Sequence, residues 1–394
     1  MTVPSRSGPA RAKARTLFAA AAVASAAAVA LAVPAAASAA PIHGRSAGTA
    51  TGPAVFVQTD NTAGNQVVAY ARASDGTLTL AGTYPTGGLG GQLAGSVVDH
   101  LASQGSLQYD AAQHLLVAVN AGSNSVTVFG VHGTRLHQRQ IIGSGGQFPV
   151  SVAIHGNLVY VLNALRGGSV QGYRLSPAGR LAFLRGSHRR LHLSQSATPQ
   201  FVNTPGQVSF SPSGSQLIVT TKANGNDIDV FGVQPGGRLS ASPVVNSEGS
   251  TVPFAIAFDQ AGHLVIANAG TNSLATFTLG SDGTTTLIDS VGTGQAATCW
   301  VALAGGTLYA SNAGSANVSG YTSSASGQLT LLGQTATDPG TVDAAAAPGG
   351  AFLYVQTGAN GIVDGFSVGT GGALTSLGSV TVAGAAGGEG IAAS

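Results

Sequence analysis

The most reactive side chain in this sequence is that of Cys299, the only cysteine among 394 residues. Its thiol could attack a substrate as a nucleophile if a neighbouring base removed its proton. No histidine lies close to it in the sequence, and free cysteines are more often small, buried apolar residues. We therefore favour a structural role for the thiol. A single cysteine also excludes an internal disulfide, so packing and hydrogen bonds must stabilise the fold.

A second pattern that could do chemistry is the pair His188 and His192, which are four residues apart. On a helix this spacing would place both imidazoles on one face, where they could bind a metal ion. No third ligand lies nearby, and the neighbouring Arg189 and Arg190 would repel a cation. The sequence therefore predicts neither a metal site nor a cofactor.

The first 39 residues read as a secretory signal peptide. Four basic residues precede an alanine-rich apolar run over residues 17–33, which is followed by "AAASAAP". We place the cleavage after Ala39, with Ala40 as the alternative. A membrane anchor is less favoured, because the apolar core is short and made largely of alanine. Arg11 and Arg15 are not adjacent, which favours Sec export. We expect a secreted or extracytoplasmic protein with no membrane span after signal removal.

Removing the leader reverses the sign of the net charge. Four of the 16 basic residues lie in it and none of the 14 acidic ones do, so 12 basic and 14 acidic residues remain, a net charge of −2. The basic character of the full chain therefore belongs to the leader. This balance predicts no nucleic-acid partner.

Repeated phrases indicate which elements must position these residues. The stretch "LLVAVNAGSNSVTVFG" from Leu115 returns as "LVIANAGTNSLATFTLG" and "LYASNAGSANVSGYTSS". Seven such phrases recur about every 44 residues, the length of a four-stranded propeller blade. Two intervals are longer, because they contain the first insertion (residues 89–105) and the second insertion (residues 187–206).

Within one repeat the pattern is four short strands joined by turns, such as "PVSVAI", "LVYVLN", "SVQGYRL" and "RLAFLRG". The first repeat lacks its innermost strand, and the chain ends with "EGIAAS", where an eighth inner strand would begin. We therefore predict an all-β, seven-bladed β-propeller whose ring is closed by the C-terminal strand pairing into blade one. It forms a single domain over residues 54–394, after a linker over residues 40–53.

In this architecture both insertions lie on one face, beside the central channel. That mouth is the expected ligand site. Near the starts of the inner strands, or in the second insertion, lie the residues that we predict to contact a ligand: Gln104, Gln207, Cys299, Trp300, Arg189 and Arg190. Lys222 follows a second strand at the same face. The simpler interpretation is that it is exposed and solvated, and the alternative is a ligand contact.

Charge is distributed unevenly around the predicted ring. Eight of the 12 basic residues after the leader fall between Arg135 and Arg190, and eight acidic residues follow Arg238, which is the last basic residue. This uneven distribution would give the ring a basic side and an acidic side, and the resulting dipole could orient an anionic ligand. An incidental bias on a solvated edge is the simpler interpretation.

Several segments resemble the propeller-type lactonase family, which includes 6-phosphogluconolactonase-like and carboxymuconate-cyclase-like proteins. They include "SQGSLQYDAAQHLLVAVNAGSNSVTVF", "PGQVSFSPSGSQLIVTTKANGNDIDVF" and "GQAATCWVALAGGTLYASNAGSANVSGY". The likeness spans nearly the whole chain after the leader. The phrase "VNAGSNSVTVF" also resembles the YVTN repeats of surface propellers.

The resemblance implies opening or closing of a lactone ring in the central channel. Such chemistry needs a base to activate water and a donor or cation for the oxyanion. The family uses histidine, glutamate and arginine there, whereas "SLQYD", "PVSVAI" and "QVSFS" contain no histidine or arginine, and Thr221 occupies a position where an acid would help. Glu389 and Asp343 remain as possible catalytic bases, with Lys222 or an insertion arginine as the oxyanion partner.

Two functions follow from these observations. The first is a secreted lactonase-like hydrolase that acts on a small lactone or other anionic ligand. The second is a non-catalytic extracellular propeller that binds a glycan, a peptide or a protein partner at the mouth. Another lyase or isomerase activity is a lesser alternative. We expect the protein to be a monomer.

Overall fold

The computed structural model describes residues 52–394. The predicted signal peptide and all but the end of the predicted linker lie outside the described residues. Within the described part, no helix has both the length and the apolar character needed to cross a membrane.

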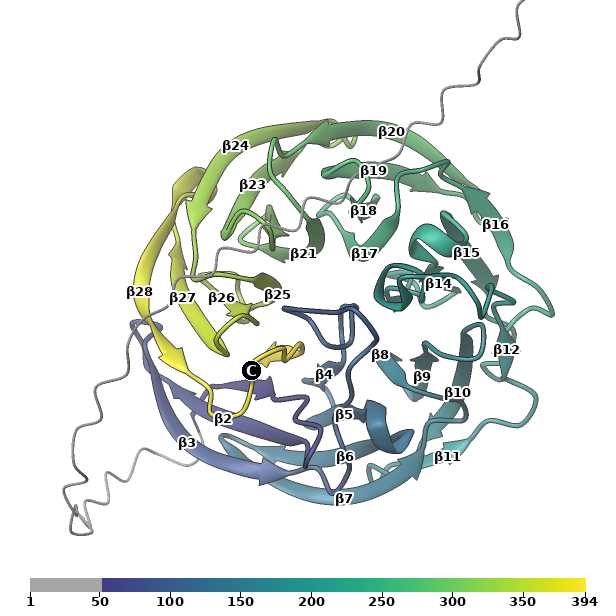
Figure 1. The fold of residues 1–394 in the computed structure, drawn as a ribbon, viewed down its shortest axis with the longest axis horizontal. Helices are drawn as coiled ribbons and strands as arrows, with labels where there is room; N and C mark the ends of the chain where they lie inside the picture. Colours follow the sequence, from purple (N-terminus) through teal and green to yellow (C-terminus); the bar gives the residue numbers. More distant parts are fainter. Residues whose placement is uncertain (1–51) are drawn as a thin grey trace, which may run out of the picture. The chain divides into compact units, whose positions relative to one another are not determined.

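Seven antiparallel sheets stand around a central axis as the blades of a propeller (Figure 1). From the centre outward, blade one contains β29 (Ile391–Ala393), β1 (Ala54–Gln58), β2 (Gln66–Arg72) and β3 (Leu78–Pro85). Blade two contains β4 (Leu107–Asp110), β5 (Leu115–Asn120), β6 (Ser125–His132) and β7 (Arg135–Gly143). Blade three contains β8 (Pro149–His155), β9 (Leu158–Asn163) and β10 (Ser169–Leu175), and both β11 (Leu181–Phe183) and β12 (Arg189–Arg190) pair with β10.

The remaining four blades have the same order. Blade four contains β13 (Val208–Phe210), β14 (Gln216–Thr220), β15 (Asp227–Gly232) and β16 (Val244–Ser247). Blade five contains β17 (Pro253–Phe258), β18 (Leu264–Asn268), β19 (Ser273–Leu279) and β20 (Thr285–Gly292). Blade six contains β21 (Thr298–Ala304), β22 (Thr307–Asn312), β23 (Asn317–Ser323) and β24 (Leu329–Ala336). Blade seven contains β25 (Thr341–Ala346), β26 (Phe352–Thr357), β27 (Ile362–Val368) and β28 (Leu374–Thr381).

The burial of each strand explains why the repeated phrases look as they do. The second strand of a blade is packed on both faces, so β5 and β9 are continuous apolar runs that end in a buried asparagine. The outermost strands, such as β24, have one face toward solvent and alternate between exposed and covered residues. The apolar core therefore lies between neighbouring blades, and it continues around the ring.

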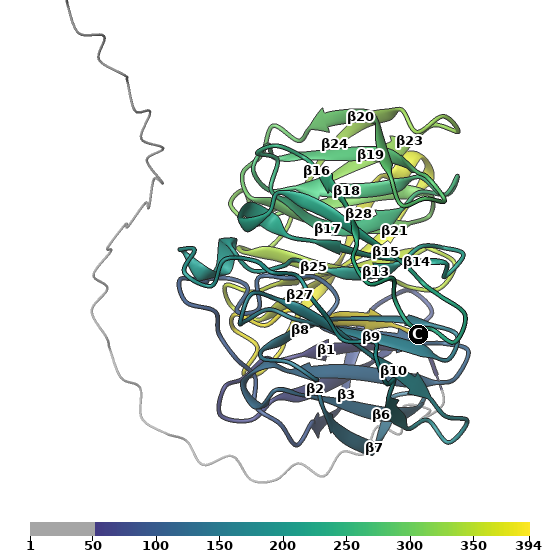
Figure 2. The same ribbon diagram turned by 90° about the vertical axis from the view of Figure 1, so that its right-hand side faces the viewer.

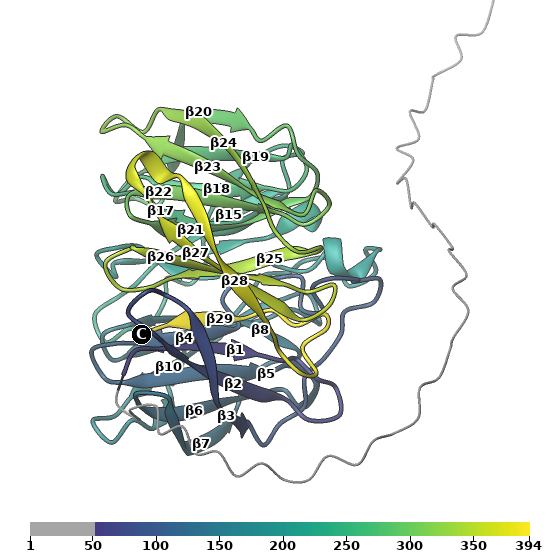
Figure 3. The same ribbon diagram turned by 90° about the vertical axis from the view of Figure 1, so that its left-hand side faces the viewer.

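The C-terminal strand closes the ring, as predicted. β29 pairs antiparallel with β1, with Val55 opposite Ala393 and Val57 opposite Ile391. The Ser394 hydroxyl also accepts a hydrogen bond from the backbone N–H of Ala54, at 2.9 Å. Figure 3 shows β29 beside β1, between blades seven and two. Closure therefore pairs the inner edge of β1, which would otherwise be open.

Both insertions extend from the same face of the ring, to the left of the strands in Figure 2. Four short 3₁₀ helices complete the described structure: η1 (Ala121–Ser123), η2 (Gln200–Val202), η3 (Lys222–Asn224) and η4 (Thr370–Gly372). The two insertions contact each other, because the Gln200 side chain accepts a hydrogen bond from the backbone of Ala94 at 2.9 Å. They form one continuous cover over part of the mouth.

Candidate functional site at the mouth of the propeller

The end of the first insertion and the residue that follows it pass across the hub, and we call these residues, 99–106, the crossing segment. The Gln104 side chain donates to the carbonyl of Val301 in blade six at 2.8 Å, and the Ser103 hydroxyl donates to the carbonyl of Val150 in blade three at 2.9 Å. The Ser106 hydroxyl donates to the carbonyl of Glu389, just before β29, at 2.8 Å. These bonds tie the crossing segment to three separate parts of the ring.

The crossing segment contributes residues to two pockets. The mouth pocket, of about 370 Å³, lies on the side of the insertions. Its lining comes from both insertions, from blades five and six, and from η3: Ser96, Val97, Val98, Asp99, Ala102, Phe201, Val202, Lys222, Val252, Phe254, Ala269, Gly270, Ala297, Cys299, Trp300 and Ala313. The channel pocket, of about 220 Å³, lies farther along the inner strands and contains Gln104, Asp343 and Tyr109.

Lys222 is buried in the mouth pocket, so the expectation of an exposed, solvated lysine was wrong. Its ammonium donates to the carbonyls of Ala102 at 2.6 Å and Phe201 at 2.7 Å, and to the Thr204 hydroxyl at 3.2 Å. The ammonium also lies 5.1 Å from the centroid of the Phe254 ring. Burial lowers the pKa of Lys222, and the charge of Asp99 opposes this shift. The lysine is enclosed because both insertions fold over the end of β14.

Asp99 is the acidic partner in this pocket, and sequence reasoning missed it. One of its carboxylate oxygens accepts hydrogen bonds from the backbone N–H groups of Leu101 and Ala102, both at 2.8 Å, and the other accepts from Ser103 at 2.9 Å. Burial raises the pKa of Asp99, while these hydrogen bonds and Lys222 lower it. Asp99 is the only acidic residue of the first insertion, which is the signal that could have identified it.

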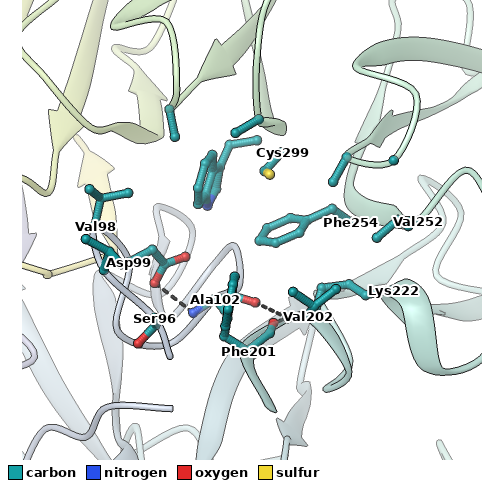
Figure 4. A pocket seen from close by; sticks show the side chains of 16 residues that line it. Ser96, Val98, Asp99, Ala102, Phe201, Val202, Lys222, Val252, Phe254 and Cys299 are labelled. Atoms are coloured by element: carbon teal, nitrogen blue, oxygen red, sulfur yellow. Dashed lines mark hydrogen bonds between the residues drawn. The ribbon is translucent and has the colours of Figure 1, made fainter. Parts of the chain in front are cut away.

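Cys299 and Trp300, at the start of β21, line the same pocket. Figure 4 shows Cys299 in this lining. The Trp300 indole N–H donates to the carbonyl of Ser103 at 2.6 Å, and its ring packs edge-on against Phe254 with centroids 5.1 Å apart. Burial raises the pKa of the Cys299 thiol to about 12, so the thiol stays protonated near neutral pH and is a poor nucleophile. Phe254 was not predicted, although it follows Pro253 at the start of an inner strand.

Two other predicted residues, Gln104 and Asp343, line the channel pocket instead. Burial raises the pKa of Asp343. Gln207 lines neither pocket, because its side-chain oxygen accepts a hydrogen bond from the backbone of Ile256 and joins blades four and five. The residues predicted from the sequence are therefore divided between two pockets and the wall of the ring.

Glu389 is fully buried beneath the crossing segment. One oxygen of its carboxyl group accepts hydrogen bonds from the N–H groups of Gly105 at 2.9 Å and Ser106 at 3.3 Å, and its other oxygen lies 3.2 Å from the Ser103 hydroxyl oxygen. Burial raises its pKa well above the ordinary value, and the nearby carboxylate of Asp343 adds to the shift. In this structure the Glu389 side chain holds the crossing segment in place and lines neither pocket.

Arg189 and Arg190 form β12 at the outer edge of blade three. The Arg189 guanidinium donates to the carbonyls of Ser240 and Leu239, both at 2.6 Å, so it joins blade three to blade four. Neither arginine lines the mouth pocket. Among residues 52–394 no group of three or more histidine, cysteine or acidic side chains is arranged to hold a metal ion.

Neither a protein-family model nor a curated protein sequence matches this chain. Solved structures do match its fold. A periplasmic gluconolactonase from Pseudomonas aeruginosa superposes with a TM-score of 0.69 at 19% identity, over 86% of this chain and 98% of the other. A provisionally named 6-phosphogluconolactonase from Bacteroides fragilis gives 0.69 at 18% identity, over 89% and 100%. A protein from Lactobacillus plantarum gives 0.70 at 19% identity, over 87% and 99%. The expected resemblance is therefore confirmed at the level of the fold, and this chain is a seven-bladed propeller that shares its fold with these structures.

Proposed function

We propose that this protein is an extracytoplasmic, lactonase-like propeller that binds a small lactone in the mouth pocket and opens its ring by hydrolysis. The signal-like leader and the fold shared with a periplasmic gluconolactonase support the location and the activity. The proposal keeps the activity expected from the sequence. It moves the reacting groups from the hub carboxylates to Asp99 and Lys222.

One observation carries this proposal: a buried carboxylate and a buried ammonium border the same apolar cavity. Hydrolysis of a cyclic ester requires a base that activates water and a positive charge that stabilises the oxyanion. Both effects are stronger in a site that excludes water, because the effective dielectric constant is lower there. Glu389 is a weaker candidate, because its carboxylate is covered by the crossing segment.

The raised pKa of Asp99 makes its carboxylate a stronger base than an exposed one. In the proposed reaction Asp99 takes a proton from a water molecule, whose oxygen bonds to the acyl carbon of the lactone. The ring C–O bond then breaks, and Asp99 passes the proton that it took from water to the ring oxygen, which becomes a hydroxyl group. Lys222 stabilises the oxyanion as a nearby charge. The protonated thiol of Cys299 forms part of the wall.

A second candidate function is binding without turnover. It is favoured by the hydrogen bonds of the same two residues, because every ammonium donor of Lys222 already has a protein acceptor. The carboxylate of Asp99 likewise accepts three backbone N–H groups. In this alternative the pair only holds the two insertions together around the ligand.

Acid release from a panel of lactones, measured by pH-stat on the secreted protein, tests the proposal. The panel contains γ-butyrolactone, γ-decalactone, an N-acyl homoserine lactone and glucono-1,5-lactone. We expect Asp99→Asn to lower kcat about 100-fold or more, the usual contribution of a general base. Asp110→Asn is the matched control, because Asp110 also accepts backbone hydrogen bonds in a turn but lines neither pocket.

The outcomes separate the alternatives. Saturable binding with no acid release from any lactone would favour the second candidate. Turnover that survives in Asp99→Asn but disappears in Asp343→Asn or Glu389→Gln would show that the hub carboxylates, and not Asp99, catalyse the reaction. Circular dichroism and thermal unfolding of each variant show whether a lost activity reflects a lost fold.

A further inference from the structure

Among residues 52–394, no side chain offers a free cation to a ligand in the mouth pocket. Lys222 is the only basic residue among those that line it, and its three N–H donors point to Ala102, Phe201 and Thr204. Its charge is balanced by Asp99, the only acidic residue of the lining. A phosphate dianion placed here would lose its hydration without gaining unpaired donors, which is strongly unfavourable.

Other polar groups in the lining are also occupied. The Trp300 indole N–H is bonded to the carbonyl of Ser103, and the Ser96 hydroxyl donates to the carbonyl of Leu93 at 2.8 Å. A sugar lactone carries several hydroxyl groups, each of which needs a partner when it leaves water. These occupied groups leave few partners for a polyhydroxylated ring.

The surfaces that remain are apolar. The cavity is surrounded by apolar side chains, among them Val98, Val202, Val252 and Phe254 (Figure 4). The cavity volume of about 370 Å³ is near the lower end of the range for small-molecule sites, which is roughly 300–1,000 Å³. It therefore suits one small ligand with a substantial apolar part.

The opening of the cavity is apolar as well. Val97 lies at the rim and is 80% exposed. A valine side chain this exposed next to an apolar cavity adds apolar surface that an alkyl chain extending out of the cavity would contact.

From these observations we infer that the ligand of the mouth pocket is an uncharged lactone carrying an alkyl chain, and that phosphorylated or polyhydroxylated sugar lactones are excluded. The lactone ring in this inference rests on the proposed function. The alkyl chain rests on the apolar lining of the mouth pocket. Ring opening adds water across the ester and gives a hydroxy acid, which ionises at neutral pH. The ionised product is poorly accommodated beside Asp99, which favours its release.

Isothermal titration with a series of 2-alkylcyclopentanones tests the chain independently of turnover. These ketones resemble an alkylated five-membered lactone in size and shape, but they lack the ring oxygen and cannot be hydrolysed. We expect Kd to fall about three- to fourfold for each added methylene, as complete burial of a methylene group requires. Glucono-1,5-lactone and its 6-phosphate are expected to show no saturable binding.

Two variants check that binding occurs in the mouth pocket. Val97→Asp places a charge at the rim and is expected to weaken binding of 2-hexylcyclopentanone at least about threefold. Leu80→Asp is the matched control, because Leu80 is also an exposed apolar residue, at 62%, but lies on the outer strand β3. Cys299 gives a second readout, since a bound ketone should slow its alkylation by N-ethylmaleimide at pH 9, measured by mass spectrometry.

A Kd that does not change with chain length, tight binding of the sugar 6-phosphate, or equal effects of Val97→Asp and Leu80→Asp would each overturn the inference. The outcome is separable from that of the proposed function. Ketones that bind with the expected chain dependence, while no lactone releases acid, would support the ligand class and reject the hydrolysis. Lactones that are hydrolysed equally well at every chain length would support the hydrolysis and reject the ligand class.

Discussion

Asp60 illustrates how strongly single carboxyl groups at the hub are perturbed by burial. It is fully buried, accepts a hydrogen bond from the backbone N–H of Glu389 at 2.8 Å, and lies beside the Gln58 amide. Burial raises the pKa of Asp60 from 3.8 to about 8. In blade four, burial raises the pKa of Asp229 to about 7. The folded protein therefore binds protons that the unfolded chain releases between about pH 4 and pH 8.

This difference in proton binding sets the direction of the pH dependence of stability. Because the folded state holds more protons than the unfolded state in this range, the free energy of unfolding should decrease as pH rises from 5 to 8. The lowered pKa of Lys222 acts in the opposite direction, but only at pH values above its folded pKa. Urea unfolding at a series of pH values measures the net effect.

Asp60→Asn should reduce the difference in bound protons between the folded and unfolded states by about one, because asparagine does not titrate. The unfolding free energy should then depend less steeply on pH. Its amide can donate to the Gln58 side-chain oxygen, which is buried without a hydrogen-bond partner, so the fold should tolerate the change. Asp75→Asn is the control, since Asp75 is exposed, and hydrogen bonds from Thr77 lower its pKa. An unchanged slope between pH 5 and pH 8 in Asp60→Asn would show that Asp60 is ionised in the folded protein.

At the scale of elements, the crossing segment is the structural feature on which both pockets depend. The side chain of Gln104 makes two hydrogen bonds with Val301 in β21, donating to the carbonyl at 2.8 Å and accepting from the N–H at 3.0 Å. In Gln104→Leu the buried backbone groups of Val301 would lose both partners. We expect this change to cost about 2–6 kcal/mol of unfolding free energy, at about 1–3 kcal/mol for each of the two unpaired groups.

The chain contains a matched control for this substitution. The Gln140 side chain makes the same pair of hydrogen bonds with Leu181, at 2.9 and 2.7 Å, but it joins two outer strands near solvent. Water can replace those bonds, so Gln140→Leu should cost less than about 1 kcal/mol. Equal losses in the two variants, measured by urea unfolding, would mean that the crossing segment is not held as the structure indicates.

The insertions also mark the limit of what the sequence could predict. The repeat spacing locates them because each blade has a fixed length, and apolar periodicity is a local signal. Their path across the hub depends on contacts between residues far apart in the chain, such as Lys222 with Ala102 and Trp300 with Ser103. No local pattern encodes such contacts, so the lysine was expected to be exposed and Asp99 was overlooked.

At the scale of the whole molecule, the repeat pattern predicted the closed ring correctly, because closure requires only a count of strands. Blade one lacks an inner strand, and the final residues have the length and apolar character to supply it. Cys299, Trp300 and Lys222 were likewise selected by their positions relative to the strands, and all three line the mouth pocket. Their hydrogen-bond partners had to come from the structure.

Closure also makes the stability of the whole ring depend on its last four residues. Deleting residues 391–394 removes β29, leaves the edge of β1 unpaired, and exposes core that Ile391 covers in the intact chain. Loss of one buried isoleucine and of several backbone hydrogen bonds should cost about 3 kcal/mol or more. The open edge should also promote association between molecules, because an unpaired apolar strand can accept a strand from another chain.

Ser394→Ala separates the strand from its terminal hydrogen bond. It removes only the hydroxyl that contacts Ala54 and should cost about 1 kcal/mol or less. Thermal unfolding together with light scattering compares the two variants. If the truncated protein unfolded at the same temperature as the intact one and remained monomeric, the pairing of β29 with β1 would contribute nothing to closure, and the ring would have to be held by the packing of adjacent blades alone.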